Sequence, residues 1–550
     1  MLVIEPSPGR ELQWQDINWT AATANVRRLQ GRIFRAARCG EWAKVKSLQK
    51  LLVRSQAAKL LAIRQVTQQN RGRLTPGLDG VVVDTPEARV RLLQDGLDLR
   101  GYRPKPVRRV RIPKANGKTR PLGIPTVLDR VMQAIVKLAL EPEWESRFEP
   151  NSYGFRPGRS TMDAIRAIHT TMAARGCSQW VLDADISGCF DNIDHEALLA
   201  RLPVFTEVVR RWLKAGVVEF GSYQESAAGT PQGGIISPLL ANIALDGMER
   251  LFGSEKARGQ YCPPSARMGL DRGVSCVRYA DDLIVTAPSR AIIEEHVLPR
   301  LTAFLAERGL TLSEAKTRVV HASDGFDFLG FTIRRFKRTL LTLPAKGKVL
   351  AHLRSIKAYL STHKQAPAGQ VIRDLNPVIR GWANYYRHGT SKQAFSLVDN
   401  HMWIKLWAWA KRRHPKKSAR WVKRRYFRND WTFYEGNAQL ATCAPTPITR
   451  FVKVKGTASP LDPSQRAYWH QRRQRAIALR THSRNRRTLR QRQLGMCGLC
   501  HTPLGMSDTD DHHIIPTSAG GTTALSNRML VHRWCHQAHH QRTRATSTKA

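Results

Sequence analysis

The chain has 550 residues, more than one hydrophobic core usually supports, so several domains are expected. Its apolar fraction of 42% permits globular folding and excludes a chain that is disordered throughout. Its net charge of +46 at pH 7 is clustered, which favours a nucleic-acid partner over a merely soluble basic protein.

The cellular compartment is indicated by features that the sequence lacks. No apolar run approaches the roughly 18 residues needed to cross a bilayer. The opening "MLVIEPSPGRELQW" shows no basic start followed by an apolar stretch, so no secretory signal is expected. Of nine cysteines only Cys497 and Cys500 are closely paired, with Cys535 downstream. This pattern favours a reducing cytoplasm and one metal site over a disulfide framework.

The first part of the chain combines helical and extended patterns. Residues 20–70 are expected to be helical because Val26, Leu29 and Ile33 recur at helical spacing among Arg and Lys. The stretch "RGRLTPGLDGV" then predicts a loop. Residues 107–125 predict two short strands joined by the turn "ANGK".

The middle of the chain predicts a strand-rich unit followed by helices. A strand should end near residues 184–186, before a turn and a helix from about Asp194. "GTPQGGIISPLLANIAL" predicts a glycine-rich turn and a helix, and "SCVRYADDLIVTA" predicts two strands joined by a tight turn. Strands should continue to about residue 335, and residues 350–410 should again be helical.

Two adjacent carboxylates, Asp281 and Asp282, stand between the two strands of that hairpin. Burying such a pair costs free energy unless a cation is bound. With Asp185 or Asp183 from the strand "VLDADI", the pair can form a two-metal site of the kind that activates a 3′-hydroxyl and stabilises leaving pyrophosphate. The alternative is a solvated Asp-Asp turn.

The surrounding motifs identify a family. "YADD" at 279–282 resembles the catalytic motif of reverse transcriptases, especially those encoded by group II introns. "RIPKANGKTRPLGIPT", "YGFRPGRSTMDAI", "DADISGCFDNIDH", "GTPQGGIISPLLANIAL", "LSEAKT" and "FLGF" resemble the successive polymerase blocks, in order, and "LNPVIRGWANYY" resembles the maturase, or thumb, segment. The resemblance implies an α+β right-hand polymerase with fingers, an antiparallel palm sheet and a helical thumb.

The resemblance also implies roles for individual residues of the polymerase. Asp185, Asp281 and Asp282 fall on the catalytic Mg²⁺ ligands, two ions being expected, and Asp183 falls outside the motif. Phe190 falls on the position that selects dNTP over rNTP, with an ordinary core Phe as the alternative.

Further residues of the same blocks are expected near the incoming nucleotide. Gln232 would contact it, and Gly233 and Gly234 would let the backbone approach it. Lys114 and Arg120 would hold the triphosphate or touch the template, and Lys316 would support the same region.

The C-terminal segment predicts a zinc site. Cys497-x-x-Cys500 and His532-x-x-Cys535 supply three thiolates and one imidazole at spacings that close a tetrahedral Zn²⁺ site. The residues between and after these pairs resemble the HNH, or ββα-metal, endonuclease motif, in which a second CxxC pair is usual where His532 stands here. A zinc knuckle without cleavage activity is the alternative.

By the HNH resemblance, His513 is the general base that activates water and Asn527 holds it in place. His512, His536 and His540 would bind one catalytic Mg²⁺ or similar ion, with His539 the rival for the last position. His536 and His540 share one face of a helix because they are four residues apart.

The basic stretches are expected to bind nucleic acid, since "KRRHPKKSARWVKRR" has no compensating acidic run; a solvated charged face is the alternative. Trp403, Trp407 and Trp409 could stack on bases, but the i, i+4 spacing of the first two favours a packed helix face.

We therefore expect five units: an N-terminal helical RNA-binding extension (1–75), fingers and palm (76–335), thumb or maturase domain (336–410), basic DNA-binding segment (411–490) and HNH domain (491–550). The family implies intron RNA, double-stranded target DNA and dNTPs as partners. It also implies cytoplasmic action on the bacterial nucleoid, with an organellar host as the alternative. A splicing factor with a decayed polymerase and an intron-independent reverse transcriptase, such as a retron or defence enzyme, are the rival classes.

Overall fold

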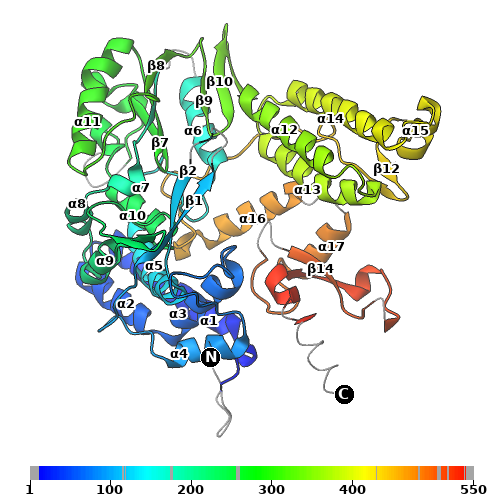
Figure 1. Cartoon of the computed structure of the whole chain (residues 1–550). Helices are drawn as coiled ribbons and strands as arrows, with labels where there is room; N and C mark the ends of the chain where they lie inside the picture. The colour runs from blue at the N-terminus through cyan, green and yellow to red at the C-terminus, as the bar shows by residue number, and fades with distance from the viewer. Residues whose placement is uncertain are drawn as a thin grey trace.

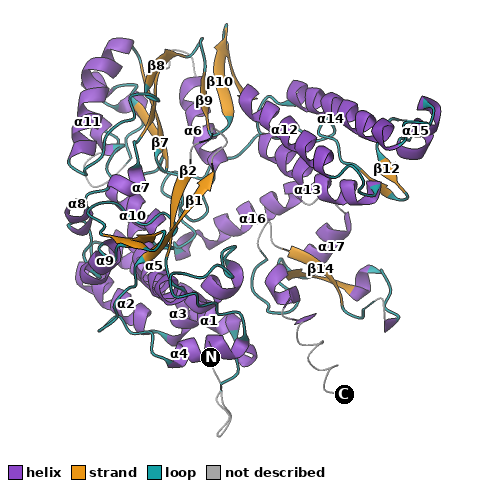
Figure 2. Ribbon diagram, in the orientation of Figure 1, coloured by secondary structure: helices purple, strands orange, loops and turns teal. Residues whose placement is uncertain are grey.

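The computed structural model describes residues 12–540 except 114–116, 118, 174–177, 256–260, 429, 481–483, 505–508, 517–518 and 538, and except the side chains of 477–480 and 484. Helices pack beside mostly antiparallel sheets, so the α+β expectation is confirmed (Figures 1 and 2). None of the described helices is both long and apolar enough to cross a membrane.

Helices build the N-terminal part, as the apolar spacing predicts. They are α1 (Trp19–Arg38), α2 (Trp42–Arg54), α3 (Gln56–Arg64) with a π-turn over Gln65–Gln69, and α4 (Pro86–Gln94). Asn18 caps α1 by accepting a hydrogen bond from the Ala21 amide at 2.9 Å. Val26 and Ile33 are buried on one face of α1 while Arg28 is exposed on another.

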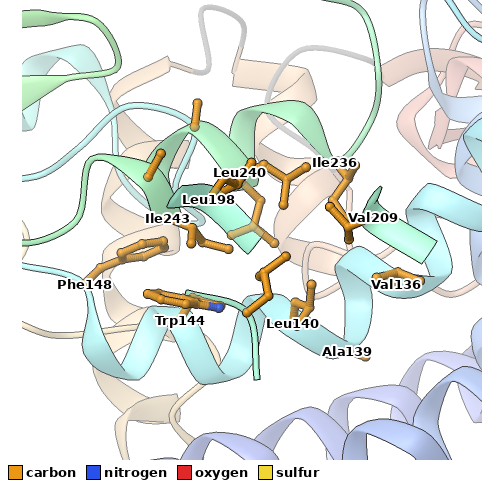
Figure 3. Packing of buried hydrophobic residues seen from close by; sticks show 14 of the residues in the cluster. Val136, Ala139, Leu140, Trp144, Phe148, Leu198, Val209, Ile236, Leu240 and Ile243 are labelled. Atoms are coloured by element: carbon orange, nitrogen blue, oxygen red, sulfur yellow. The ribbon is translucent and has the colours of Figure 1, made fainter. Parts of the chain in front are cut away.

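A long helix, α5 (Val127–Arg147), lies at the centre of the main core, which also contains α8 (His195–Leu199), α9 (Thr206–Leu213) and α10 (Ser237–Ala244). Trp144 and Leu140 of α5 are fully buried near Leu240 and Ile243 of α10 (Figure 3). This packing fixes the helices that lie behind the site described below.

Two four-stranded sheets carry the motif residues. One has the order β2-β1-β4-β5, from β1 (Val107–Pro113), β2 (Thr119–Ile124), β4 (Val217–Glu219) and β5 (Ser222–Gln224). The other is antiparallel with the order β6-β7-β3-β8, from β3 (Trp180–Asp185), β6 (Ser275–Tyr279), β7 (Asp282–Ala287) and β8 (Arg318–His321). Alternate residues of β7 join different cores, Leu283 and Val285 on one face and Ile284 on the other. Both faces of this sheet are therefore covered.

Short helices and turns complete the region of the two sheets. They are α6 (Thr161–Ala173), α7 (Cys189–Asn192), α11 (Leu298–Ala306), a π-turn at Ile292–Val297, and 3₁₀ turns at Arg250–Phe252, Pro264–Ala266 and Gly269–Asp271. Elsewhere in the chain, 3₁₀ turns form at Trp14–Asp16, Pro463–Gln465 and Leu525–Asn527.

A third sheet leads into a helical unit drawn in yellow in Figure 1. The sheet contains β9 (Phe326–Phe328), β10 (Phe331–Phe336) and β11 (Thr339–Pro344). The unit contains α12 (Lys346–Thr362), α13 (Ala368–Tyr386), α14 (Lys392–Arg413), α15 (Ala419–Tyr426), β12 (Tyr434–Glu435) and β13 (Ala438–Gln439).

The three tryptophans of α14 belong to the packing of this unit. Trp403 and Trp407 stack on each other at 5.9 Å and both contact Phe427 and Trp431, while Trp409 is buried. The packed helix face is therefore the correct interpretation, and stacking on bases is not needed to explain these residues.

The C-terminal part contains α16 (Arg466–Arg480), α17 (Arg484–Arg492), β14 (Thr509–His513) and β15 (Arg528–His532). Figure 1 shows α16 between the helical unit and the N-terminal helices, and the small red unit of β14 and β15 below α17. The chain before α16 packs back onto the main body, since Val454 N donates to Asp163 at 2.8 Å.

Candidate active sites

Asp185 and Asp282 are directly opposite each other in the register of β3 and β7. Asp281 precedes β7 in a two-residue turn with Ala280, whose φ of 59° is left-handed. The Asp281 carbonyl accepts a hydrogen bond from Ile186 N at 3.4 Å. Gly154 makes this turn possible, because a Cβ there would lie 2.3 Å from Ala280 N. The fold thus brings together the three carboxylates that the sequence singles out.

The electrostatics of this trio favour a bound cation. Burial raises the pKa of Asp281, with repulsion from Asp185 adding to it. Burial, then Asp281 and Asp185, raise the pKa of Asp282 to about 7. Carboxylates that repel one another in a partly buried site suit divalent metal ions, which prefer oxygen ligands.

One cation of the chain already contacts the trio. Lys316 Nζ forms an ion pair with Asp185 Oδ2, and this contact raises the pKa of Lys316, whose side chain is 67% exposed. Asp183 is paired elsewhere, with Arg318 Nη2 at 3.0 Å.

Gln232 connects strand β2 to helix α7 near the trio. Its Oε1 accepts from Arg120 Nε at 2.7 Å and its Nε2 donates to Asp191 Oδ2 at 3.0 Å. A cavity of about 170 Å³ adjoins Gln232 and Asp191. Arg120 is also near enough to Asp281 to oppose the rise in its pKa. Lys114 lies outside the described residues.

The two glycines after Gln232 are required by packing within the protein, and their expected role in letting the backbone approach a nucleotide stays a prediction. Gly233 has φ +139°, and a Cβ there would lie 2.4 Å from the Gly123 carbonyl of β2. A Cβ at Gly234 would lie 2.6 Å from Ser237 Oγ. The strand β2 occupies this space at Gly233, and the side chains of Ser237 and Gln133 occupy it at Gly234.

Phe190 lies on α7 and is 7% exposed. Its ring meets the ring of Phe155 edge to face at 6.1 Å, and Phe155 is itself 51% exposed with a left-handed φ of 59°. Phe190 is therefore a core residue on one side and adjoins an exposed aromatic ring on the other.

In the C-terminal unit, Cys497, Cys500, His532 and Cys535 form one cluster whose potential ligand atoms all lie within 4.8 Å of one another. His532 Nδ1 faces Cys500 Sγ at 3.4 Å and Cys535 Sγ at 3.8 Å. Its Nε2 donates to the Pro503 carbonyl at 3.0 Å, which orients the ring. Three thiolates and one imidazole are a ligand set that fits tetrahedral zinc, with His532 at the position of the fourth ligand.

His512, His536 and His540 form a second cluster within the same distance limit. Burial, then His539 and His536, lower the pKa of His512 to about 4, so its imidazole is neutral and able to bind metal at pH 7. The ring of His539 also contacts that of His512, with ring centroids 4.9 Å apart, so His539, the rival for the last ligand position, lies beside the cluster.

His513 follows at the end of β14, and its Nε2 is buried without a hydrogen-bond partner in the described part of the chain. Among the described residues, the Asn527 side chain bonds to backbone groups and not to this ring, and its expected role of holding His513 in place stays a prediction. Its amide oxygen accepts from Ile515 N at 2.9 Å, and its nitrogen donates to the carbonyls of Ile515 and Thr522. Asn527 thus fixes the loop that follows His513.

Four family models match the chain in order. They are the N-terminal domain of reverse transcriptase (14–95), reverse transcriptase (RNA-dependent DNA polymerase) (112–333), the group II intron maturase-specific domain (349–427) and HNH endonuclease (497–542).

Curated relatives agree with these matches. Protein YkfC of Escherichia coli is 35% identical over 300 residues, 49% of this chain and 79% of YkfC. Group II intron-encoded protein LtrA of Lactococcus lactis is 30% identical over 401 residues, 58% of this chain and 66% of LtrA. An uncharacterized 91 kDa protein in the cob intron of Schizosaccharomyces pombe is 30% identical over 398 residues, 48% of its length.

The chain belongs to the group II intron-encoded reverse transcriptase/maturase family and carries a C-terminal HNH domain. It is a multifunctional group II intron protein with RNA-directed DNA polymerase and DNA endonuclease domains. Both domain families depend on metals, and the maturase and reverse transcriptase domains support binding of group II intron RNA.

Sequence reasoning on this group II intron protein missed two contacts. The ion pair of Lys316 with Asp185 joins residues 131 apart, and the sequence indicated only that Lys316 belongs to the same region. Asp510 Oδ2 lies 3.1 Å from His536 Nδ1, where it can orient a metal-binding ring. The run "DTDDHH" was the available signal, but three aspartates in it leave the choice open.

Proposed function

We propose that this protein assists the splicing of its intron RNA and then copies that RNA into DNA at a target site that its HNH domain nicks. The observation that carries the proposal is the pairing of Asp185 with Asp282 beside Asp281, in a chain that also holds the His512 cluster. The intron RNA would join one DNA strand, and the nick in the other strand would provide the 3′ end that is extended.

In the polymerase site, Asp185, Asp281 and Asp282 would hold two Mg²⁺ ions. When bound, these ions activate the primer 3′-hydroxyl and stabilise the leaving pyrophosphate. Arg120, with Lys114, would bind the triphosphate, and Gln232 would position the nucleotide through its bonds to Arg120 and Asp191. Phe190 would exclude a 2′-hydroxyl and so select dNTPs.

In the nuclease, His513 would take the proton from water as that water attacks the scissile phosphate. Asn527 would keep His513 in position by fixing the loop that follows it. His512, His536 and His540 would bind one Mg²⁺ or similar ion, which stabilises charge on the phosphate when bound. Zn²⁺ held by Cys497, Cys500, His532 and Cys535 would stabilise this small unit.

The five units proposed from the sequence divide this work. Residues 1–75 and 336–410 would bind intron RNA, residues 411–490 would bind the duplex target, and residues 76–335 and 491–550 would perform the chemistry. Arg27 supports a nucleic-acid role for the N-terminal helices. Burial and then Arg473 and Arg466 of α16 lower its pKa, whereas an acidic partner would raise it. The site of action would be the nucleoid of a bacterial host.

One assay tests the proposal. Purified protein, intron RNA, target duplex, Mg²⁺ and dNTPs should give a nicked strand and cDNA extended from the nick. Asp281→Ala should abolish cDNA and leave splicing largely intact, while Asp183→Asn, on the same strand but paired with Arg318, should keep both. His513→Ala should remove the nick and preserve extension of an artificial primer. If Asp281→Ala stops splicing as completely as cDNA synthesis, the proposed division of labour is wrong.

A further inference from the structure

A cavity of about 360 Å³ lies away from both candidate active sites, where the main body meets the helical unit that follows β11. Its walls come from α6, β11, the turn between α13 and α14, the start of α14 and residues 448–451. Two arginines from segments distant in sequence, Arg166 and Arg450, line it. Lys392, His169 and His388 line it as well. No Asp or Glu is among its lining residues in the described part of the chain.

The positive charge in this cavity is not neutralised by nearby acids. Burial and then Arg450 lower the pKa of Arg166, and burial, Arg166 and Arg450 lower the pKa of His169. Arg166 Nη1 and His169 Nδ1 are 3.2 Å apart. The carboxylate of α6, Asp163, is engaged by Arg472 at 3.0 Å and by Val454 N. An anion in the cavity would relieve this repulsion.

A buried hydroxyl supports the same conclusion independently. Thr342 of β11 lines the cavity, is 6% exposed, and its Oγ1 has no hydrogen-bond partner among the described residues. Leaving such a group unpaired costs free energy, so a ligand that bonds to it is favoured. The backbone around it is fixed, because Thr390 N donates to the Thr342 carbonyl at 2.7 Å and a Cβ on Gly389 would lie 2.6 Å from that oxygen.

Apolar and aromatic side chains also line the cavity. Met162, Ile165, Ile448 and Phe451 line it, and the Phe451 ring meets the His388 ring edge to face at 5.2 Å. The volume is within the range of small-molecule sites, so a phosphate ion alone would leave most of it empty. A nucleotide has both the anionic and the planar part that these walls match.

We propose that this cavity binds one nucleotide unit of an RNA strand, with its phosphate at Arg166, Arg450 and Thr342 and its base against Phe451. The inference rests on the proposed binding of intron RNA by this protein and adds a specific subsite to it. Free phosphate and free mononucleotides share part of the chemistry, so the test must separate them from RNA.

The decisive variant is Thr342→Val in the full-length protein. Because no described residue bonds to Oγ1, the melting temperature should stay the same or rise, whereas affinity for a fluorescent single-stranded RNA should fall about fivefold through loss of a hydrogen bond to phosphate. Thr286→Val is the matched control, since Thr286 Oγ1 is also buried and has no partner within the described ranges, but lies on β7, outside the cavity. It should leave RNA affinity unchanged.

Arg450→Gln tests the ionic contact. The slope of log affinity against log salt should become shallower by about 0.7, the change expected for one lost phosphate contact on a single strand. Arg290→Gln, which removes an exposed charge paired with Glu294, should leave the slope unchanged. RNA carrying 4-thiouridine should crosslink to the peptide that contains Phe451 in the wild type, and less in Thr342→Val.

Three results would overturn the inference. Equal RNA affinity of wild type and Thr342→Val would show that the hydroxyl meets no RNA. Stabilisation of the wild type by inorganic phosphate or UMP, with RNA binding unchanged in both cavity variants, would assign the cavity to a free anion. A loss of affinity in Thr286→Val equal to that in Thr342→Val would show an indirect effect. If the wild type itself fails to bind RNA, the proposed function fails instead.

Discussion

Asp185 and Asp282 are cross-strand neighbours on β3 and β7, so two carboxylates occupy a position where like charges destabilise a sheet. Asp281 adds a third negative charge next to them. Such an arrangement persists when a function requires it, and it leads to measurable consequences for stability as well as for catalysis.

Asp282→Asn should stabilise the metal-free protein while it abolishes DNA synthesis. The amide removes the repulsion from Asp185 and Asp281, and we expect a gain of about 1 kcal/mol in the free energy of unfolding. Denaturant unfolding and primer extension on an artificial template measure the two effects. Asp183→Asn serves as the control and should destabilise slightly, since it breaks the ion pair with Arg318. A destabilised Asp282→Asn protein would contradict the assigned repulsion.

The stability of the metal-free protein should depend on pH through Asp282. Its folded pKa of about 7 lies above the ordinary value of 3.8, so between these values the folded state binds more protons than the unfolded state. The free energy of unfolding should therefore fall as pH rises from about 4 to 7, and Asp282→Asn should lack this component. Saturating Mg²⁺ should also suppress it. Thermal melts of both proteins across this range, with and without Mg²⁺, provide the measurement.

Lys316→Gln should strengthen metal binding in the absence of nucleotide. The ammonium group is paired with Asp185, and metal ions must compete with it for that carboxylate. Because the lysine is largely exposed, the gain should be modest, roughly threefold in the Mg²⁺ or Mn²⁺ concentration that gives half-maximal stabilisation. Lys337→Gln, a lysine outside the site, controls for the change in net charge. Weaker metal binding in Lys316→Gln would show that the lysine supports the metal site.

Removal of zinc should unfold the C-terminal unit and leave the polymerase folded. The core of that unit is small, with Leu489, Leu504, Leu530 and Val531 as its buried aliphatic residues, so the bound metal is expected to supply much of its stability. Chelation or Cys500→Ala should abolish nicking and expose the unit to protease, while primer extension persists. His532→Cys should retain zinc and nicking, since a thiolate replaces the imidazole. Parallel loss of primer extension would mean that the two parts unfold together.

Local sequence patterns were sufficient for much of the fold. The hairpin around "YADD" was predictable because β-branched and apolar residues flank a two-residue turn, and the strand period places Asp282 at the end of β7. The helical spacing of Trp403 and Trp407 likewise indicated a packed face. In the C-terminal unit, the two-residue spacings pointed to the cluster of Cys497, Cys500, His532 and Cys535.

Other features depend on contacts between distant segments, which no local pattern encodes. The sequence indicated that glycines 233 and 234 matter, but not that the Gly123 carbonyl of β2, more than 100 residues earlier, lies where a Cβ of Gly233 would be. It predicted that Asn527 holds His513 in place, but not that the Asn527 side chain bonds to the backbone of the loop after His513. In both cases the residue type was informative but its partner was decided by packing.

By itself the sequence determined the family, the order of the domains' motifs and the residue types that carry the chemistry, because these follow from short spacings and strand or helix periods. Only the tertiary structure decided that Lys316 meets Asp185, that Asp510 meets His536, and that Arg166, Thr342 and Arg450 surround one cavity. Side-chain contacts between remote segments depend on how sheets and helices pack, and packing is a property of the whole fold.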